Sequence, residues 1–246
     1  MIALVTGASS GIGAATARRL ARERDARLVL VARREERLRE LADELGGATV
    51  IAADLTDPAV PAQIAQRVES EHGRLDLLVN NAGNSWPSTF ADGGWENVQR
   101  TMALNFDAVV RLTEALLPLL RRSAPSSIDN VSSTAGRVGR SKSGAYSASK
   151  FALAGWTDCL YLEERRHGVH VGLVLPGFVA TEGFPQTALT RRRATRWIVS
   201  KPERVAAAIV AAGPGGRPER YVPRAYGLAA ALRVMAPRVV RRATRG

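Results

Sequence analysis

Tyr146 and Lys150 are four residues apart, so a helix over this stretch places both side chains on one face. A free phenol has a pKa near ~10 and exchanges protons poorly at neutral pH. A neighbouring ammonium favours the phenolate, and we therefore expect Lys150 to lower the pKa of Tyr146 toward neutrality. The pair predicts an acid/base unit, although most tyrosine and lysine pairs at this spacing lie on solvated helix faces.

A glycine-rich turn follows the first expected strand and leads into an alanine-rich helix. In such a turn Gly7 allows the sharp bend, Gly11 lets the backbone approach a pyrophosphate, and Gly13 lets the helix pack closely on the strand. The hydroxyls of Ser9 and Ser10 and the helix dipole also favour a phosphate. Because the glycine spacing differs from the commonest dinucleotide fingerprint, a plain glycine-rich turn is the alternative.

The second expected strand ends on Arg33 and Arg34, with no acid before Glu35. Proteins that prefer NAD often place an acid here for the ribose 2′-hydroxyl, whereas an arginine suits the 2′-phosphate of NADP. A guanidinium binds a phosphate through paired hydrogen bonds as well as through charge. We therefore expect NADP(H) to be preferred over NAD(H); the alternative is that both arginines only cap a solvated helix.

Polar residues also follow the third and fourth expected strands. Asp54 ends the third strand, where a carboxylate can accept a hydrogen bond from an adenine amino group. Asn80 ends the fourth strand and is expected to tie neighbouring strands through its amide. The small residues within 81–83 leave room for a cofactor against the strand tip.

Expected strands alternate with expected helices along the whole chain. The strands span 2–6, 27–32, 48–53, 75–79, 126–133, 169–175 and a short stretch around 221–222. The helices span 14–24, 35–45, 58–72, 95–122, 145–166 and 201–213. This alternation predicts an α/β fold with a doubly wound, Rossmann-like parallel sheet of about seven strands and helices on both faces. We expect one domain over 1–246, with a mobile insert over a pocket at 178–200 and a basic tail at 226–246.

Asp129 is out of place in the fifth expected strand. A central parallel strand is normally apolar on both faces, and an unpaired buried carboxylate is costly. We therefore expect Asp129 to have a partner or partial exposure to solvent.

Composition narrows the classes of protein. One cysteine and three scattered histidines among 246 residues rule out an internal disulfide and give little support to a metal site. The chain has no apolar run near the ~20 residues of a membrane-spanning helix and opens directly on a strand, so we expect a cytoplasmic protein. The net charge of +12 suggests nucleic-acid binding, but the arginines are spread along the chain, which argues against it.

These motifs, in this order, resemble those of the short-chain dehydrogenase/reductase family over nearly the whole chain. The segment from Thr6 to Gly13 resembles the family's cofactor turn, and Asn80-Asn81-Ala82-Gly83 resembles its motif after the fourth strand. Pro176-Gly177 followed by Thr181 resembles the segment that holds the nicotinamide carboxamide and the phosphates. The chain departs from the pattern at Asp129, where the family has an aliphatic residue.

The resemblance also implies a catalytic tetrad. Tyr146 and Lys150 match the catalytic pair, Ser133 stands thirteen residues before the tyrosine, and Asn105 matches the fourth member. Tyr146 would exchange a proton with the substrate oxygen, and Lys150 would lower its pKa and bind the nicotinamide ribose. Ser133 would hydrogen-bond the substrate oxygen, and Asn105 would hold a water that links Lys150 to solvent.

The resemblance therefore implies an NADP(H)-dependent oxidoreductase that acts on a carbonyl or secondary alcohol without a metal. The cofactor-binding residues expected are Gly7, Ser9, Ser10, Gly11, Ile12, Gly13, Arg33, Arg34, Asp54, Leu55, Asn81, Ala82, Gly83, Tyr146, Lys150, Pro176, Gly177, Val179 and Thr181. The alternative is a non-catalytic sensor or scaffold of the same fold. The substrate is expected to be a largely apolar small molecule, with walls drawn from Ser85, Trp86, 137–139, Phe178, Val179 and 184–197.

Helices are the expected contact surfaces for partners of this chain. The resemblance implies a homodimer or homotetramer that pairs through the two long helices, 95–122 and 145–166. The tail combines an apolar helix with arginines, which fits a peripheral membrane contact or a partner's groove. A helix packed on its own fold is the favoured alternative for the tail.

Overall fold

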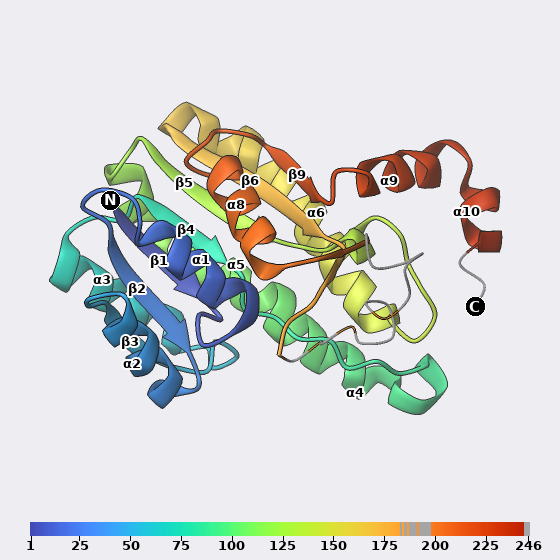
Figure 1. The fold of residues 1–246 in the computed structure, drawn as a ribbon, viewed down its shortest axis with the longest axis horizontal. Coiled ribbons are helices and arrows are strands. Elements are labelled where there is room, and N and C mark those ends of the chain that lie inside the picture. Colours follow the sequence, from blue (N-terminus) through green and yellow to red (C-terminus); the bar gives the residue numbers. More distant parts are fainter. Residues whose placement is uncertain (183, 185, 187–190, 192–197, 244–246) are drawn as a thin grey trace.

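The computed structural model describes residues 1–182, 184, 186, 191 and 198–243 (Figure 1). Seven parallel strands form one sheet in the order β3-β2-β1-β4-β5-β6-β9. Their bounds are β1 Ile2–Thr6, β2 Arg27–Ala32, β3 Thr49–Ala52, β4 Leu77–Asn80, β5 Ser126–Val131, β6 Val169–Pro176 and β9 Glu219–Val222. The predicted seven-stranded, doubly wound α/β fold is confirmed.

Helices cover both faces of the sheet. Their bounds are α1 Gly11–Leu20, α2 Glu35–Glu44, α3 Val60–His72, α4 Phe90–Met102, α5 Ala108–Arg122, α6 Gly144–Glu164, α8 Pro202–Ala212, α9 Tyr226–Met235 and α10 Pro237–Ala243. The side chains of α1, α2 and α8 share one buried cluster, and those of α3, α5 and α6 share another. Helices α9 and α10 extend away from the sheet (Figure 1). No helix in the described ranges combines the length and apolar character that a membrane crossing requires.

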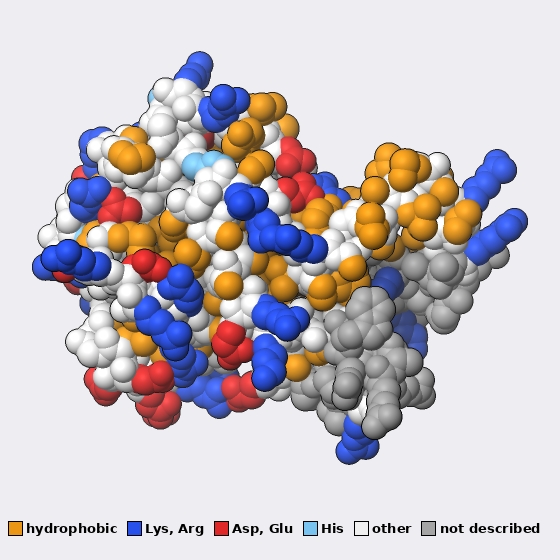
Figure 2. Space-filling view, turned by 45° about the horizontal axis from the view of Figure 1, so that its top comes forward, with side chains coloured by type: hydrophobic (Ala, Val, Ile, Leu, Met, Phe, Trp, Pro, Cys, Tyr) orange, Lys and Arg blue, Asp and Glu red, His pale blue; other side chains and the backbone are white. Residues whose placement is uncertain are grey.

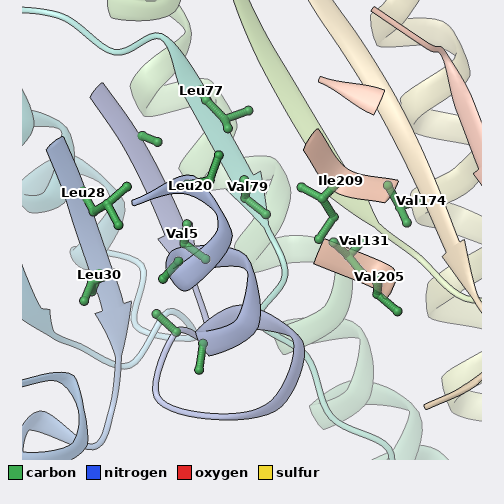
Figure 3. Close-up of a cluster of buried hydrophobic side chains, with 14 of the residues drawn as sticks. Val5, Leu20, Leu28, Leu30, Leu77, Val79, Val131, Val174, Val205 and Ile209 are labelled. Atoms are coloured by element: carbon green, nitrogen blue, oxygen red, sulfur yellow. The ribbon is translucent and has the colours of Figure 1, made fainter. Parts of the chain in front are cut away.

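The two cores follow from the alternation of side chains along the strands. In β1, Ala3 and Val5 point into the cluster with α1 and α8, whereas Ile2 and Leu4 point into the cluster on the other face. Figure 3 shows the first cluster, in which Ile209 of α8 lies near Val131 and Val174. A sheet buried on both faces requires the nearly continuous apolar strands that the sequence contains.

The single helix expected over 95–122 differs most from the structure. Its first part, α4, begins at Phe90 and breaks at Gly94, whose φ is +48°. A π-helical segment, Ala103–Asp107, then separates α4 from α5. A π segment adds one residue to a turn, and such segments are frequent at functional sites. It carries Asn105, so the irregularity lies where the sequence places a tetrad residue.

Smaller departures concern element boundaries and the insert. Helix α1 begins at Gly11, because Ser10 is extended, with a φ of −169°, and caps it. The expected insert contains two short paired strands, β7 Phe178–Val179 and β8 Val199–Ser200. The mobility expected for the insert falls partly on 183, 185, 187–190 and 192–197, which lie outside the described residues.

The structure contradicts the expectation that Asp129 has a partner or partial exposure to solvent. The residue is 0% exposed in the centre of the sheet, and its carboxyl oxygens have no hydrogen-bond partner of good geometry among the described residues. It occupies space left by two glycines, since a Cβ at Gly172 or at Gly213 would lie 2.5 or 2.2 Å from its oxygens. Burial raises the pKa of Asp129 well above its usual value, and the nearby Gly213 amide lowers it by less. Burial therefore favours the protonated, uncharged form of the carboxyl.

Candidate active site

The carboxyl ends of β1 and β4 frame the cleft, because the connections leave these neighbouring strands toward opposite edges of the sheet. Ligands of open α/β sheets bind at such a point. The cavity there has a volume of about 550 Å³. Every predicted cofactor-binding residue except Gly13 lines it, together with Ser133.

The glycine turn needs its glycines for two different reasons. Gly7 and Gly11 have φ values of +65° and +56°, a region that side chains disfavour. A Cβ at Gly13 would lie 2.2 Å from the carbonyl oxygen of Gly7, so α1 packs against the turn only with glycine there. The first turn of α1 thus opens onto the cleft, where its free amides and dipole favour a phosphate. We call the glycine turn and the first turn of α1 the phosphate cradle. Gly13 packs inside it and does not line the cavity.

Thr6 joins the glycine turn to the end of β4. Its hydroxyl accepts hydrogen bonds from the amides of Asn81 and Ala82, both at 2.9 Å. The side-chain amide of Asn81 donates to the Thr6 carbonyl at 2.9 Å. Asn80 donates to Asn130 of β5 at 2.9 Å, so its amide links neighbouring strands as predicted. These bonds fix the floor of the cleft.

Arg33 and Arg34 lie at the nucleotide end of the cleft. The guanidinium of Arg34 donates to Ser9 at 3.1 Å and to Ser10 at 2.8 Å, and thus reaches the glycine turn. Asp54, which lines the same end, accepts from the amide and the hydroxyl of Thr56. These bonds lower the pKa of Asp54, and the charge of Arg33 adds to the effect. The end of the cleft therefore presents two cations and one ionised carboxylate.

Three predicted catalytic residues meet at the other end of the cleft. Tyr146 and Lys150 come from the first turns of α6, and Ser133 follows β5. Lys150 is 4% exposed, and its ammonium donates to the Val131 carbonyl at 2.9 Å. Burial lowers its pKa to about 8. Its Nζ lies 5.9 Å from the centre of the Tyr146 ring.

The expected lowering of the Tyr146 pKa by Lys150 is wrong for this structure. Tyr146 is half-buried, and this burial raises the pKa of its phenol. The Ser133 hydroxyl and the charge of Arg140 lower that pKa by smaller amounts. The ammonium is directed to Val131, whose carbonyl the sequence pattern does not identify.

Asn105 does not line the cavity. Its side chain is 0% exposed, accepts from the Asn84 amide at 2.9 Å and donates to the Asn84 carbonyl at 2.9 Å. It also donates to Ser149 of α6 at 3.1 Å. A Cβ at Gly83 would lie 3.0 Å from the Asn105 oxygen and 3.4 Å from the Lys150 nitrogen. Asn105 thus holds the wall beside Lys150, and its role in a water relay stays a prediction.

The segment after β6 covers the glycine turn. A Cβ at Gly11 would lie 3.1 Å from the Thr181 side chain, so the two segments are in contact. Glu182 forms an ion pair with Arg37 of α2 on the opposite rim. This ion pair ties the segment after β6 to α2, next to the contact between Thr181 and Gly11.

The substrate end differs from the expected walls. Ser85, Phe178, Val179 and Phe184 line the cavity, whereas Trp86 and residues 137–139 do not. The rest of the expected wall at 184–197 lies largely outside the described residues. Gln186, which belongs to the expected wall, also lines the cavity. Sequence reasoning missed further lining residues: Asn84, Leu104, Arg140 and Ser143.

Arg140 is the most informative of the missed residues. Its guanidinium carbon lies 4.7 Å from the centre of the Phe178 ring, a cation–π geometry. It makes no ion pair with a described residue of the chain. Its position between Ser133 and Tyr146 in the sequence is the signal that could have identified it. The guanidinium therefore adds positive charge to the substrate end.

These features fit a nicotinamide dinucleotide. The glycine cradle accepts a pyrophosphate, the two arginines suit an additional phosphate, and Tyr146 and Lys150 lie at the far end. No cluster of three or more histidine, cysteine or acidic residues able to hold a metal ion occurs in the described part of the chain.

A sequence model of the short chain dehydrogenases matches residues 1–191. The chain belongs to the short-chain dehydrogenase/reductase family. This family uses NAD or NADP as its redox cofactor.

Individual relatives agree with this assignment. The rhamnolipids biosynthesis 3-oxoacyl-[acyl-carrier-protein] reductase of Pseudomonas aeruginosa is 37% identical over 93% of this chain and 88% of its own length. Dehydrogenase/reductase SDR family member 7B of Bos taurus is 34% identical over 73% of this chain, which spans only 58% of that relative. A metagenomic short-chain oxidoreductase solved in complex with NADP has a TM-score of 0.74 and 34% identity, over 86% of this chain and 89% of its own.

Proposed function

We propose that this short-chain dehydrogenase/reductase transfers a hydride between NADP(H) and the carbonyl or secondary alcohol of a largely apolar small molecule. The observation that carries the proposal is the meeting of Ser133, Tyr146 and Lys150 at one end of a dinucleotide-sized cleft. The bound cofactor supplies the hydride, and the chain supplies position and proton transfer.

Each residue has a role that its surroundings support. Tyr146 gives its proton to the substrate oxygen in reduction and takes it back in oxidation. The Ser133 hydroxyl donates to the same oxygen and shares the developing charge. Its present hydrogen bond to the Pro176 carbonyl is 3.3 Å long and therefore readily replaced. Lys150 holds a proton beside the phenol, and its pKa of about 8 suits transfer near neutral pH.

The preference for NADP(H) rests on Arg33 and Arg34. The strand end contributes no acid there, and both guanidiniums line the nucleotide end of the cavity. The metagenomic relative in complex with NADP supports the same cofactor. The reduction of a ketone is supported by the 3-oxoacyl reductase from Pseudomonas aeruginosa, whose name describes that direction.

A second candidate is a cofactor-binding sensor or scaffold without turnover. The retained Tyr146, Lys150 and Ser133 argue against it, because a sensor would need the cradle alone. The test is a panel of apolar ketones and secondary alcohols with both cofactors, followed by nicotinamide absorbance. Turnover with any member supports the enzyme; cofactor binding without turnover across the panel supports the sensor.

Tyr146→Phe separates the two roles of the site. The substitution removes the proton donor and keeps the ring, so we expect kcat to fall by roughly 10²-fold or more while NADPH affinity changes little. Fluorescence titration with NADPH provides the control for binding. Turnover close to that of the wild type would contradict the assigned role.

A further inference from the structure

The C-terminal helices turn apolar side chains toward solvent. In α9, Leu228, Leu232 and Met235 recur at helical spacing and are 77%, 42% and 76% exposed. Ala230, on the opposite side, is buried. A helix that packs on its own fold buries its apolar face, so α9 has the reverse orientation. Figure 2 shows the resulting apolar surface on the part of the molecule that projects to the right.

This arrangement overturns the favoured expectation that the tail packs on its own fold. Val234 and Val239 are also exposed, at 80% and 57%. Apolar side chains exposed together on one face of a helix are typical of an interaction site. We call the surface formed by Leu228, Leu232, Met235 and Val239 the apolar tail surface.

The base of α9 is held firmly, so its orientation follows from the fold. The Tyr226 ring lies against Gly177, where a Cβ would come within 2.2 Å of it. The Tyr226 hydroxyl donates to the Ile198 carbonyl at 3.4 Å. The helix thus starts at the rim of the cofactor cleft and carries the apolar tail surface outward.

The charges carried by α9 and α10 have a single sign. Arg233, Arg238, Arg241 and Arg242 lie on α9 and α10, and the chain contains no aspartate or glutamate after Glu219. Figure 2 shows basic side chains at the outer end of the projecting segment. Apolar side chains bordered by arginines are typical of helices that lie in the interface of an anionic membrane.

A second copy of the chain is a poorer occupant. A two-fold contact places the same patch against itself, and would bring these arginines together without an acid on either segment. A membrane with anionic headgroups meets both requirements at once, since its acyl boundary accepts the apolar side chains and its phosphates bind the guanidiniums.

We propose that α9 and α10 form a docking surface for a membrane that carries anionic phospholipid. Leu228, Leu232, Met235 and their neighbours enter the boundary between headgroups and acyl chains. The arginines of both helices bind the lipid phosphates. The mouth of the catalytic cleft is then held close to the lipid surface.

The test is co-sedimentation of the full chain with vesicles. One vesicle contains phosphatidylcholine alone, and the other contains equal parts of phosphatidylcholine and phosphatidylglycerol. We expect binding to the anionic vesicle at least roughly tenfold tighter than to the neutral one, and weaker in high salt. Equal binding to both, or binding to neither, overturns the proposal.

Variants assign the binding to the two helices. Leu228→Gln/Leu232→Gln/Met235→Gln removes the apolar side chains and is expected to lower anionic-vesicle binding roughly tenfold or more. The matched control is Phe90→Gln/Trp95→Gln, which alters equally exposed apolar residues on α4 and is expected to bind normally. All substitutions lie on the surface, so circular dichroism should report an unchanged fold.

Charge and self-association are tested in the same way. Arg238→Gln/Arg241→Gln/Arg242→Gln should weaken binding, whereas the control Arg22→Gln/Arg24→Gln/Arg39→Gln, with the same change in net charge, should not. If both charge variants lose the same amount of vesicle binding, the binding depends on net charge and not on the arginines of α10, and the proposal is overturned. If light scattering shows that the Leu228/Leu232/Met235 variant loses an association that the wild type makes, the occupant is a second copy and the membrane proposal is wrong.

Discussion

Arg34 contacts the two serines that begin the phosphate cradle, and Arg33 lies next to it on the rim of the same cavity. Two guanidiniums at the end of β2 can bind an extra phosphate group bidentately, whereas they have little to bind on a free ribose hydroxyl. The choice between the cofactors is therefore a property of one or two side chains.

Arg33→Ala tests this choice. Removing the charge should weaken NADPH binding roughly tenfold or more and leave NADH binding nearly unchanged, because only NADPH carries the 2′-phosphate. Fluorescence titrations with both cofactors measure the two affinities. Arg39→Ala, on the exposed face of α2, is the matched control and should change neither. An equal loss for both cofactors would remove the phosphate contact from the proposal.

Arg140 acts on the proton donor through its charge. It lowers the pKa of Tyr146, against the larger effect of burial, which raises it. Arg140→Gln should therefore raise the pKa of Tyr146 and move the corresponding limb of the pH profile toward alkaline pH, by about a few tenths of a unit. The pH dependence of kcat/KM with NADPH measures the shift.

Two controls separate charge from shape in that experiment. Lys142→Gln removes a nearby exposed charge that is not among the influences on Tyr146, and should leave the profile unchanged. High salt should shift the wild-type profile in the direction of the Arg140 variant, since an exposed charge is screened. An Arg140→Gln profile identical to that of the wild type would refute the electrostatic role.

At the scale of elements, β5 contains a buried acid whose ionisation is disfavoured by the fold. The pKa of Asp129 is raised in the folded state and ordinary in the unfolded state. The folded state therefore binds one more proton over the interval between these two values. The contribution of Asp129 to the free energy of unfolding is fully present below the pKa of the unfolded state. It falls as pH rises, by about 1.4 kcal/mol per pH unit over that interval.

Asp129→Asn keeps the shape of the side chain and removes its ionisation. We expect the variant to be more stable than the wild type at pH 8, by roughly 1–3 kcal/mol, and nearly equal to it at pH 4. Urea unfolding at the two pH values measures the difference. A stability gap that does not depend on pH would show that ionisation of Asp129 is not responsible.

The π segment at 103–107 and helix α6 illustrate a second property of elements. The segment carries Asn105, and α6 carries Ser149, Tyr146 and Lys150. The hydrogen bond from Asn105 to Ser149 joins the two elements beside the reacting end of the cleft. The position of Lys150 therefore depends on a contact between helices as well as on its spacing from Tyr146.

At the scale of the whole molecule, two exposed apolar surfaces lie on different elements. Leu162 on α6 is 70% exposed, and Phe151 on the same helix is 43% exposed. The family resemblance implies self-association through this helix, and exposed apolar residues on it support that proposal. The apolar tail surface lies on α9 and α10 and is proposed for lipid.

The oligomeric state tests whether α6 serves self-association while the apolar tail surface does not. We expect light scattering to give the mass of a dimer or a tetramer. Leu162→Glu should shift the mass toward that of one chain, because it buries a charge in the expected interface. The triple glutamine variant of α9 should keep the mass of the wild type. A wild-type mass equal to one chain would contradict self-association.

Features that depend on local spacing can be predicted from the amino-acid sequence alone. The glycine turn, the placement of Tyr146 and Lys150 on one helix and the alternation of apolar strands with helices agree with the structure, because a turn, a helix face or a pleat is set by neighbouring residues. The positions lining the cleft follow from the same pattern, since parallel strands carry their carboxyl ends to one edge.

Contacts between distant segments become visible only in the folded molecule. The burial of Asp129 between Gly172 and Gly213, the hydrogen bond from Lys150 to Val131 and the stacking of Arg140 on Phe178 each join parts of the chain that no local spacing relates. The outward direction of the apolar tail surface has the same origin. Periodicity marks the apolar face of a helix, but only the position of the helix on the fold determines whether that face meets the core or the solvent.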